Sequence, residues 1–195
     1  DIYDQVWFED QPIQRLSVLA PDLTDRIFAV NGWSKTYAMT GWRIGWGIGP
    51  AALIRAMGSV QGQITSGACS IAQAAALAAL TGDQGLLATR LVAMRARRDR
   101  VVAGLNAMPG VRCPAPDGAF YVFPDITGAI AAGGFASDAE LCAWLLDEAG
   151  VAIVPGRAFG LPGHARLSFA YAEADLEAGI GRIHTALAGR IAATA

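Results

Sequence analysis

Apolar residues fall into short compact runs in the first part of this chain. Residues 27–30 (IFAV), bounded by Arg26 and Asn31, are typical of a buried strand. Residues 43–48 (RIGWGI), which end at Gly49 and Pro50, are typical of a second strand. Pro50 suits the start of a helix, and the alanine-rich residues 70–80 predict another helix. The first part of the chain therefore combines strands with helices.

A longer helical stripe follows over residues 86–108. Its apolar positions lie on one face of a helix, and they include Leu87, Leu91, Met94, Val101 and Leu105. We expect this helix to connect two structural units, residues 1–82 and residues 83–195.

The second unit alternates strand and helix patterns. Three runs are typical of strands: residues 119–123, 151–154 and 166–170. Ser137 and Glu140 have the spacing of a capping box, at the start of a helix that Gly150 ends. Apolar residues spaced by four, three and four from Leu176 predict a final helix. The alternation predicts a mixed α/β fold.

Composition narrows the classes of partner. Of the 195 residues, 53% are hydrophobic and 16% are charged, which excludes a mainly disordered chain. The formal net charge of -2 provides no basic field for nucleic acid or an anionic membrane. No apolar stretch is long enough to span a bilayer. We therefore expect neither a nucleic-acid nor a membrane partner.

Cysteines and histidines suggest neither a disulfide framework nor a metal site. The three cysteines are odd in number and widely spaced, as expected for small buried side chains in a reducing compartment: Cys69, Cys113 and Cys142. His164 and His184 are far apart, without the ligand spacing of a zinc site. We expect no metal.

Lys35 is the first candidate for chemistry. It lies in residues 34–45 (SKTYAMTGWRIG), in a loop after a predicted strand and eight residues before Arg43. In apolar, aromatic surroundings a lysine loses hydration, which favours an amine able to attack a carbonyl. The alternative is an ordinary surface lysine, and position alone does not decide between the two.

Residues 34–45 resemble the cofactor-lysine motif of the fold-type I, class I pyridoxal-phosphate-dependent aminotransferases, and in particular of their bacterial aspartate aminotransferase branch. Three further segments agree in order and separation: residues 1–3 (DIY), 118–124 (GAFYVFP) and 166–170 (RLSFA). This resemblance implies an α/β fold. Residues 1–82 would form part of the large cofactor domain, and residues 83–195 a smaller α+β carboxyl-terminal domain.

The resemblance implies a role for four residues. Lys35 would hold pyridoxal 5'-phosphate as a Schiff base and then move a proton at the substrate Cα. Arg43 would bind the cofactor phosphate, and Tyr3 would donate a hydrogen bond to the cofactor's phenolic oxygen. Arg166 would hold the substrate α-carboxylate as a bidentate fork.

Two departures from the family pattern limit how far the roles of the family's residues can be assigned to this chain. The pattern Asp-x-x-Tyr puts the carboxylate that pairs with the pyridine nitrogen one residue before Asp1, so Asp1 is not that aspartate. Gly32 lies where some relatives have a serine that binds phosphate. We expect the chain to be the carboxyl-terminal part of a longer polypeptide, and to be inactive as a transaminase by itself.

The implied reaction moves an amino group between an amino acid, aspartate or a similar one, and a 2-oxo acid. The resemblance also implies a cytoplasmic homodimer that acts in amino-acid metabolism. Alternatives remain open because the same lysine serves other reactions on this fold. They are a pyridoxal-phosphate-dependent lyase or cyclopropane-forming synthase, and the cofactor-binding sensor domain of a transcription regulator.

Overall fold

The computed structural model describes residues 2–194, which divide into two compact units, one that ends at Leu91 and one that begins at Val92. The boundary falls inside the helix α4 (Gly85–Asn106), which begins three residues after the expected boundary at residue 82. The assignment of the two units to a large and a small domain stays a prediction. Asp1, which the sequence excluded as the nitrogen-pairing aspartate, lies outside the described residues.

Two short antiparallel strands form the sheet of the first unit. Strand β1 (Ala29–Gly32) pairs with β2 (Gly45–Ile48), so that Ala29 faces Ile48 and Gly32 faces Gly45. Both strands begin two residues later than predicted. Arg43 explains the later start of β2, because its φ of 51° is left-handed and cannot continue an extended strand.

Helical segments are the other regular elements of the first unit before α4. They are α1 (Leu16–Leu19), the 3-10 helices η1 (Pro21–Arg26) and η2 (Thr40–Trp42), α2 (Ala51–Ile64) and α3 (Ser70–Thr81). Pro50 is the residue before α2, as the sequence predicted, since proline has a fixed φ and tolerates a helix start. Apolar side chains remain exposed here, among them Val30 (57%) and Ile48 (66%) of the paired strands.

A three-stranded antiparallel sheet forms the second unit, with β5 (Ala165–Ser168) between β3 (Tyr121–Val122) and β4 (Val154–Pro155). In its register Val122 faces Leu167, and Val154 faces Arg166. The strands are shorter than predicted. At β3 the reason is Ala119, whose φ of 60° interrupts the extended backbone.

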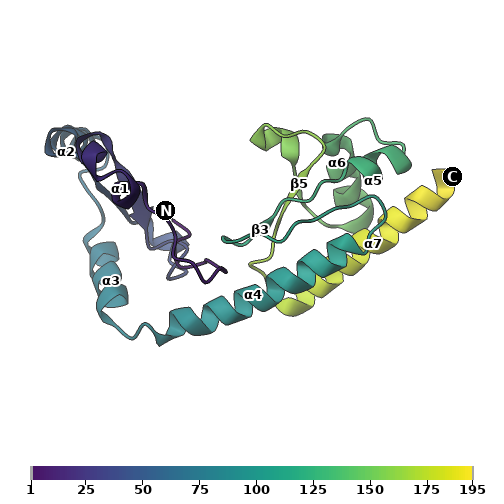
Figure 1. Cartoon of the computed structure of the whole chain (residues 1–195), viewed down its shortest axis with the longest axis horizontal. Helices are drawn as coiled ribbons and strands as arrows, with labels where there is room; N and C mark the ends of the chain where they lie inside the picture. The colour runs from purple at the N-terminus through teal and green to yellow at the C-terminus, as the bar shows by residue number, and fades with distance from the viewer. Residues whose placement is uncertain (1, 195) are drawn as a thin grey trace. The chain divides into compact units, whose positions relative to one another are not determined.

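Four helical segments follow α4 in the second unit (Figure 1): α5 (Thr127–Ala132), α6 (Asp138–Ala149), the 3-10 helix η3 (Gly156–Phe159) and α7 (Glu173–Thr194). Helix α7 packs against α5 and α6, and its buried residues are Leu176, Ile183 and Leu187. It also meets α4, since a Cβ added at Gly104 would lie 2.6 Å from Ile180 Cγ2. The predicted mixed α/β architecture is confirmed.

The predicted caps of α6 are present. Ser137 Oγ accepts a hydrogen bond from the Glu140 backbone N–H at 3.2 Å, and Gly150 ends the helix with a left-handed φ of 61°. The Glu140 carboxylate accepts from the Ala136 N–H at 2.6 Å instead of from Ser137. The helix start is therefore held by reciprocal bonds, displaced by one residue from the usual pattern.

Two of the three cysteines behave as predicted. Cys113 and Cys142 are buried, and burial raises the pKa of each thiol to about 11, so both stay protonated at neutral pH. The prediction was wrong for Cys69, which is exposed because it precedes α3 in an exposed loop. Within residues 2–194, none of the helices has the length and apolar character needed to cross a membrane.

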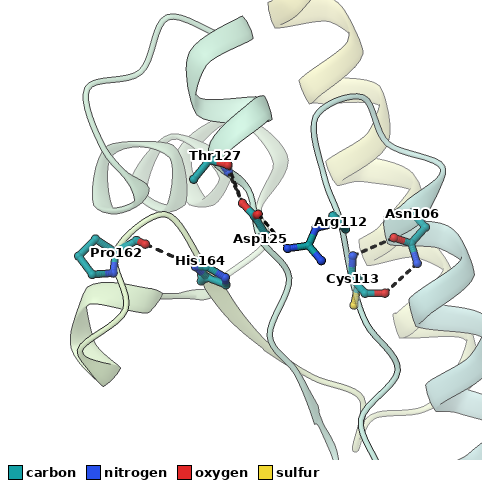
Figure 2. A network of polar contacts seen from close by, with 7 residues as sticks. All are labelled: Asn106, Arg112, Cys113, Asp125, Thr127, Pro162 and His164. Carbon is teal, nitrogen blue, oxygen red and sulfur yellow. Dashed lines mark hydrogen bonds and ion pairs between the residues drawn. The ribbon is translucent and has the colours of Figure 1, made fainter.

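Asp125 links three segments of the second unit (Figure 2). Its backbone exchanges two hydrogen bonds of 2.9 Å with Arg112 and bridges to His164. Its carboxylate accepts from the Thr127 hydroxyl at 2.6 Å and from the Thr127 N–H at 3.0 Å, at the start of α5. These bonds lower the pKa of Asp125. Burial opposes the shift, while the Arg112 guanidinium and the charge of His164 add to it.

We predict that Asp125 contributes to stability only when it is ionised. Its folded pKa is lowered, so its contribution is present above about pH 4 and is lost as the pH falls through the folded pKa. Asp125→Asn keeps an acceptor oxygen but cannot titrate. Urea unfolding between pH 3 and 6 should show that the free energy of unfolding falls less steeply with acid in this variant. The same slope as wild type would contradict the prediction, and Asp147→Asn, on an exposed position of α6, is the control.

Candidate functional site

Two of the predicted site residues, Lys35 and Arg43, lie in the loop at one end of the β1–β2 ladder. Gly32 and Gly45 form the last pair of that ladder, and the loop between them carries both Lys35 and Arg43. Lys35 comes three residues after Gly32, and Arg43 two residues before Gly45. Antiparallel pairing thus brings the two ends of this loop together.

Tyr3 is tied to the same end of the ladder through its neighbours. The Asp4 carboxylate accepts a hydrogen bond of 3.0 Å from the Asn31 side-chain amide, and Arg15 approaches the same oxygen at 3.3 Å. On the other side of Tyr3, a Cβ added at Gly32 would lie 3.3 Å from Ile2 Cδ1. The segment that carries Tyr3 is therefore fixed to the last two residues of β1.

The close approach of two glycines closes the ladder. A Cβ added at Gly32 would lie 3.1 Å from both Gly45 Cα and the Ile44 carbonyl oxygen, and one added at Gly45 would lie 3.0 Å from the Asn31 carbonyl oxygen. These are backbone atoms, which cannot rotate away. The backbone therefore leaves little room for a side chain at Gly32.

The loop itself is compact. The Tyr37 N–H donates to the Trp33 carbonyl at 3.0 Å, so the chain turns tightly around Lys35, whose side chain is half-buried. Its neighbour Thr36 is buried. Arg43 is exposed, and its guanidinium donates to the Thr40 carbonyl at 2.7 Å.

A cavity of about 330 Å³ adjoins this loop. Its lining includes Asn31, Trp33, Thr36 and Trp46, and it extends to Leu87. The indole N–H of Trp33 is buried and has no acceptor among residues 2–194. A hollow beside the lysine loop, with a buried donor in its wall, suits a ligand that carries acceptor oxygens.

Lys35 has a further property that its motif alone does not reveal. It is the only lysine among the 195 residues, whereas the other basic side chains, apart from two histidines, are arginines. A primary amine held half-buried in a compact loop is a suitable nucleophile toward a carbonyl.

Arg166 lies in the second unit, on the central strand β5. It lines a cavity of about 480 Å³ together with Tyr121, Ser168 and Tyr171. Its Cζ lies 4.5 Å from the centroid of the Tyr121 ring and 4.5 Å from that of the Phe159 ring. A guanidinium in a hollow of this kind is suited to bind a carboxylate.

Sequence reasoning missed the residues that support these four. Asp4 and Asn31 fix the Tyr3 segment, and the rings of Tyr121 and Phe159 contact Arg166. Two of them had a sequence signal: Asp4 lies next to Tyr3, and Tyr121 lies in the family-like segment of residues 118–124. The contacts of Asn31 and Phe159 join residues 27 and 7 positions apart, so spacing along the chain does not reveal them.

Comparison with known proteins gives consistent similarities. The sequence profile of the family "Aminotransferase class I and II" matches residues 1–183. An aspartate/prephenate aminotransferase of Cereibacter sphaeroides is 49% identical over 97% of this chain and 48% of its own length. The crystal structure of the aspartate aminotransferase from Rhizobium meliloti superposes with a TM-score of 0.90 at 42% identity, over 96% of this chain and 48% of that one.

A third similarity is to the aromatic aminotransferase from Pyrococcus horikoshii. That structure has a TM-score of 0.88 at 33% identity, over 97% of this chain and 50% of its own. The chain thus spans about half the length of the relatives that it matches. The fold shared with these structures is fold-type I, in its carboxyl-terminal part.

We predict that Gly32→Ala weakens the pairing of β1 and β2. The added methyl group would press on the Gly45 backbone, and overpacking of this kind should outweigh the entropy gained, for a net loss of about 1 kcal/mol. Urea unfolding would measure it. Gly41→Ala is the matched control, because a Cβ there meets nothing within 4 Å. Equal stability of the two variants would contradict the prediction.

Proposed function

The chain belongs to the class I and II aminotransferases, and from that premise we propose that it supplies the amine and anion-binding groups of a pyridoxal-phosphate-dependent aminotransferase. The reaction would move an amino group between an amino acid and a 2-oxo acid. One observation carries the proposal: the amine of Lys35, the phenol of Tyr3 and the guanidinium of Arg43 all belong to segments fixed at one end of the β1–β2 ladder.

The chemistry of these three groups fits the cofactor. A primary amine reacts with an aldehyde, a guanidinium binds a phosphate, and a phenol donates a hydrogen bond to a phenolic oxygen. Trp33 lines the neighbouring cavity, and its buried indole N–H has no acceptor among residues 2–194. Lys35, Arg43 and Tyr3 would therefore hold pyridoxal 5'-phosphate, in roles that the family resemblance assigns and the donor set supports.

Each of these three side chains would then have a separate role in the reaction. When bound, the cofactor supplies an electron sink for the pair left at the substrate Cα. Lys35 Nζ would accept the proton from the substrate Cα, as a general base held within reach of that atom. Arg43 would bind the phosphate and so fix the position of the reacting groups, while the Tyr3 hydroxyl would orient the ring.

Arg166 would bind the α-carboxylate of the amino acid. The planar fork of a guanidinium matches a carboxylate in two parallel hydrogen bonds, which a lysine ammonium cannot reproduce. Binding at two points orients the Cα–H bond for proton transfer. Support comes from the place of this side chain in a cavity and from the family motif that it matches.

The substrate, assembly and location are further proposals. We infer aspartate or a similar amino acid as the amino donor, in line with the relatives named aspartate/prephenate and aspartate aminotransferase. A homodimer and a cytoplasmic location follow from the resemblance to this family. In a coupled assay, formation of a 2-oxo acid that depends on an acceptor would support transamination. Release of pyruvate and ammonia without an acceptor would indicate a lyase.

We predict that Lys35 is the residue bonded to the cofactor. Borohydride reduction of the complete holoenzyme, followed by peptide mass mapping, should place a pyridoxyl adduct on Lys35. Lys35→Ala should abolish the adduct and lower the rate of transamination about 1000-fold, because the general base is lost. An adduct on another residue, or a Lys35→Ala enzyme with the wild-type rate, would refute the assignment.

We also predict that Arg43 determines the affinity for the cofactor phosphate. Arg43→Gln should raise the dissociation constant of pyridoxal phosphate about 10- to 100-fold, since a charge-assisted hydrogen bond is removed. Arg43→Lys should fall between wild type and Arg43→Gln, because it keeps the charge but loses the fork. Fluorescence titration would measure the constants. Arg55→Gln, on an exposed position of α2, should bind as wild type does; a comparable loss there would remove the special role of Arg43.

A further inference from the structure

Two aromatic rings support the guanidinium of Arg166. Its Cζ lies 4.5 Å from the centroid of the Tyr121 ring on β3, and 4.5 Å from that of the Phe159 ring at the end of η3. Within the described part of the second unit, no carboxylate or carbonyl forms an ion pair or hydrogen bond with this guanidinium. Arg100, Arg112 and Arg157 differ from it, since each binds a carboxylate.

This arrangement leaves the donors of Arg166 available. The five N–H groups of a guanidinium lie in its plane, whereas an aromatic ring attracts a cation through the ring face. Ring contacts can thus restrict the side chain without occupying its hydrogen-bonding edge. They also exclude water beside the cation, which strengthens its attraction for an anion.

The short helix η3, which ends at Phe159, is held in place by an ion pair between Arg157 and Asp138. Asp138 is 1% exposed, and its carboxylate accepts from the Arg157 N–H at 2.8 Å and from Arg157 Nε at 2.7 Å. Burial alone would raise the pKa of Asp138. The hydrogen bonds from Arg157 and its positive charge outweigh this effect, so the pKa lies below its ordinary value and the carboxylate stays ionised at neutral pH. The short helix that carries Phe159 is thereby fixed to the start of α6.

A second set of contacts fixes the ring of Phe159. Its centroid lies 5.9 Å from that of Phe123, edge to face, and Phe123 stacks on His164 at 5.3 Å. The Gly156 N–H, at the start of η3, donates to the His164 carbonyl at 2.7 Å. Phe159 is 47% exposed, so its position depends on these contacts more than on burial.

We propose that Tyr121 and Phe159 are positioning residues, whose rings hold the Arg166 guanidinium in the orientation that receives the substrate carboxylate. This inference rests on the proposed role of Arg166. The carboxylate would stay bound to Arg166 in the ground state and in the transition state, so loss of one ring should weaken binding in both states. Loss of a ring should therefore act on KM more than on kcat.

The experiment uses the complete holoenzyme and removes one ring at a time. Phe159→Leu should raise KM for the amino acid about tenfold, the equivalent of one cation–π contact, with kcat within about threefold of wild type. Tyr121→Leu should act in the same way. Phe159→Tyr and Tyr121→Phe keep a ring and should keep the wild-type KM. Calorimetry with maleate, a dicarboxylate without an amino group, should show the same pattern in its Kd.

Two further variants separate the possible outcomes. Phe135→Leu removes a ring that lies 5.1 Å from Arg190 in the same unit, and it should leave both KM and the maleate Kd unchanged. Arg166→Lys should raise both, because the fork is lost. If Arg166→Lys does so while neither leucine variant does, the positioning role is wrong and the proposed function stands. If Arg166→Lys changes neither quantity, the role of Arg166 fails and the positioning role fails with it.

Discussion

The close approach of two backbones at Gly32 and Gly45 is the constraint on which the first unit depends. A side chain on either residue would meet backbone atoms about 3 Å away, so the ladder closes there because both positions lack a Cβ. The loop with Lys35 and Arg43 begins and ends at this pair. The requirement for glycine at these two positions thus determines where the loop with the Lys35 amine and the Arg43 guanidinium begins and ends.

Two carboxylates have the corresponding role in the second unit. Asp138 joins the start of α6 to η3, and Asp125 joins the start of α5 to the segments of Arg112 and His164. Each carboxylate is satisfied by at least one backbone N–H group, which offsets the cost of removing a charge from water. The sheet is only two to four residues long in each strand, so these polar links supply connections that longer strands would provide through their ladders.

Motifs and helical periodicity revealed the elements, the fold class and the four candidate site residues. The long helices and the caps at Ser137 and Gly150 were predictable because their signals are local in sequence. The ends of the strands were not, since left-handed residues such as Arg43 and Ala119 have no clear local signature. Supporting contacts such as Asp4–Asn31 and Phe159–Arg166 depend on tertiary structure, and pattern reasoning does not reach them.

The exposed apolar side chains of β1 and β2 affect how the 195-residue chain can be handled. Val30 and Ile48 lie more than half exposed on a two-stranded sheet, so their apolar side chains can contact another copy of the chain. Concentrated preparations of this chain should therefore self-associate, more so in sulfate, which strengthens apolar contacts. The tendency of this chain to self-associate in solution would thus follow from the exposed side chains of this small sheet.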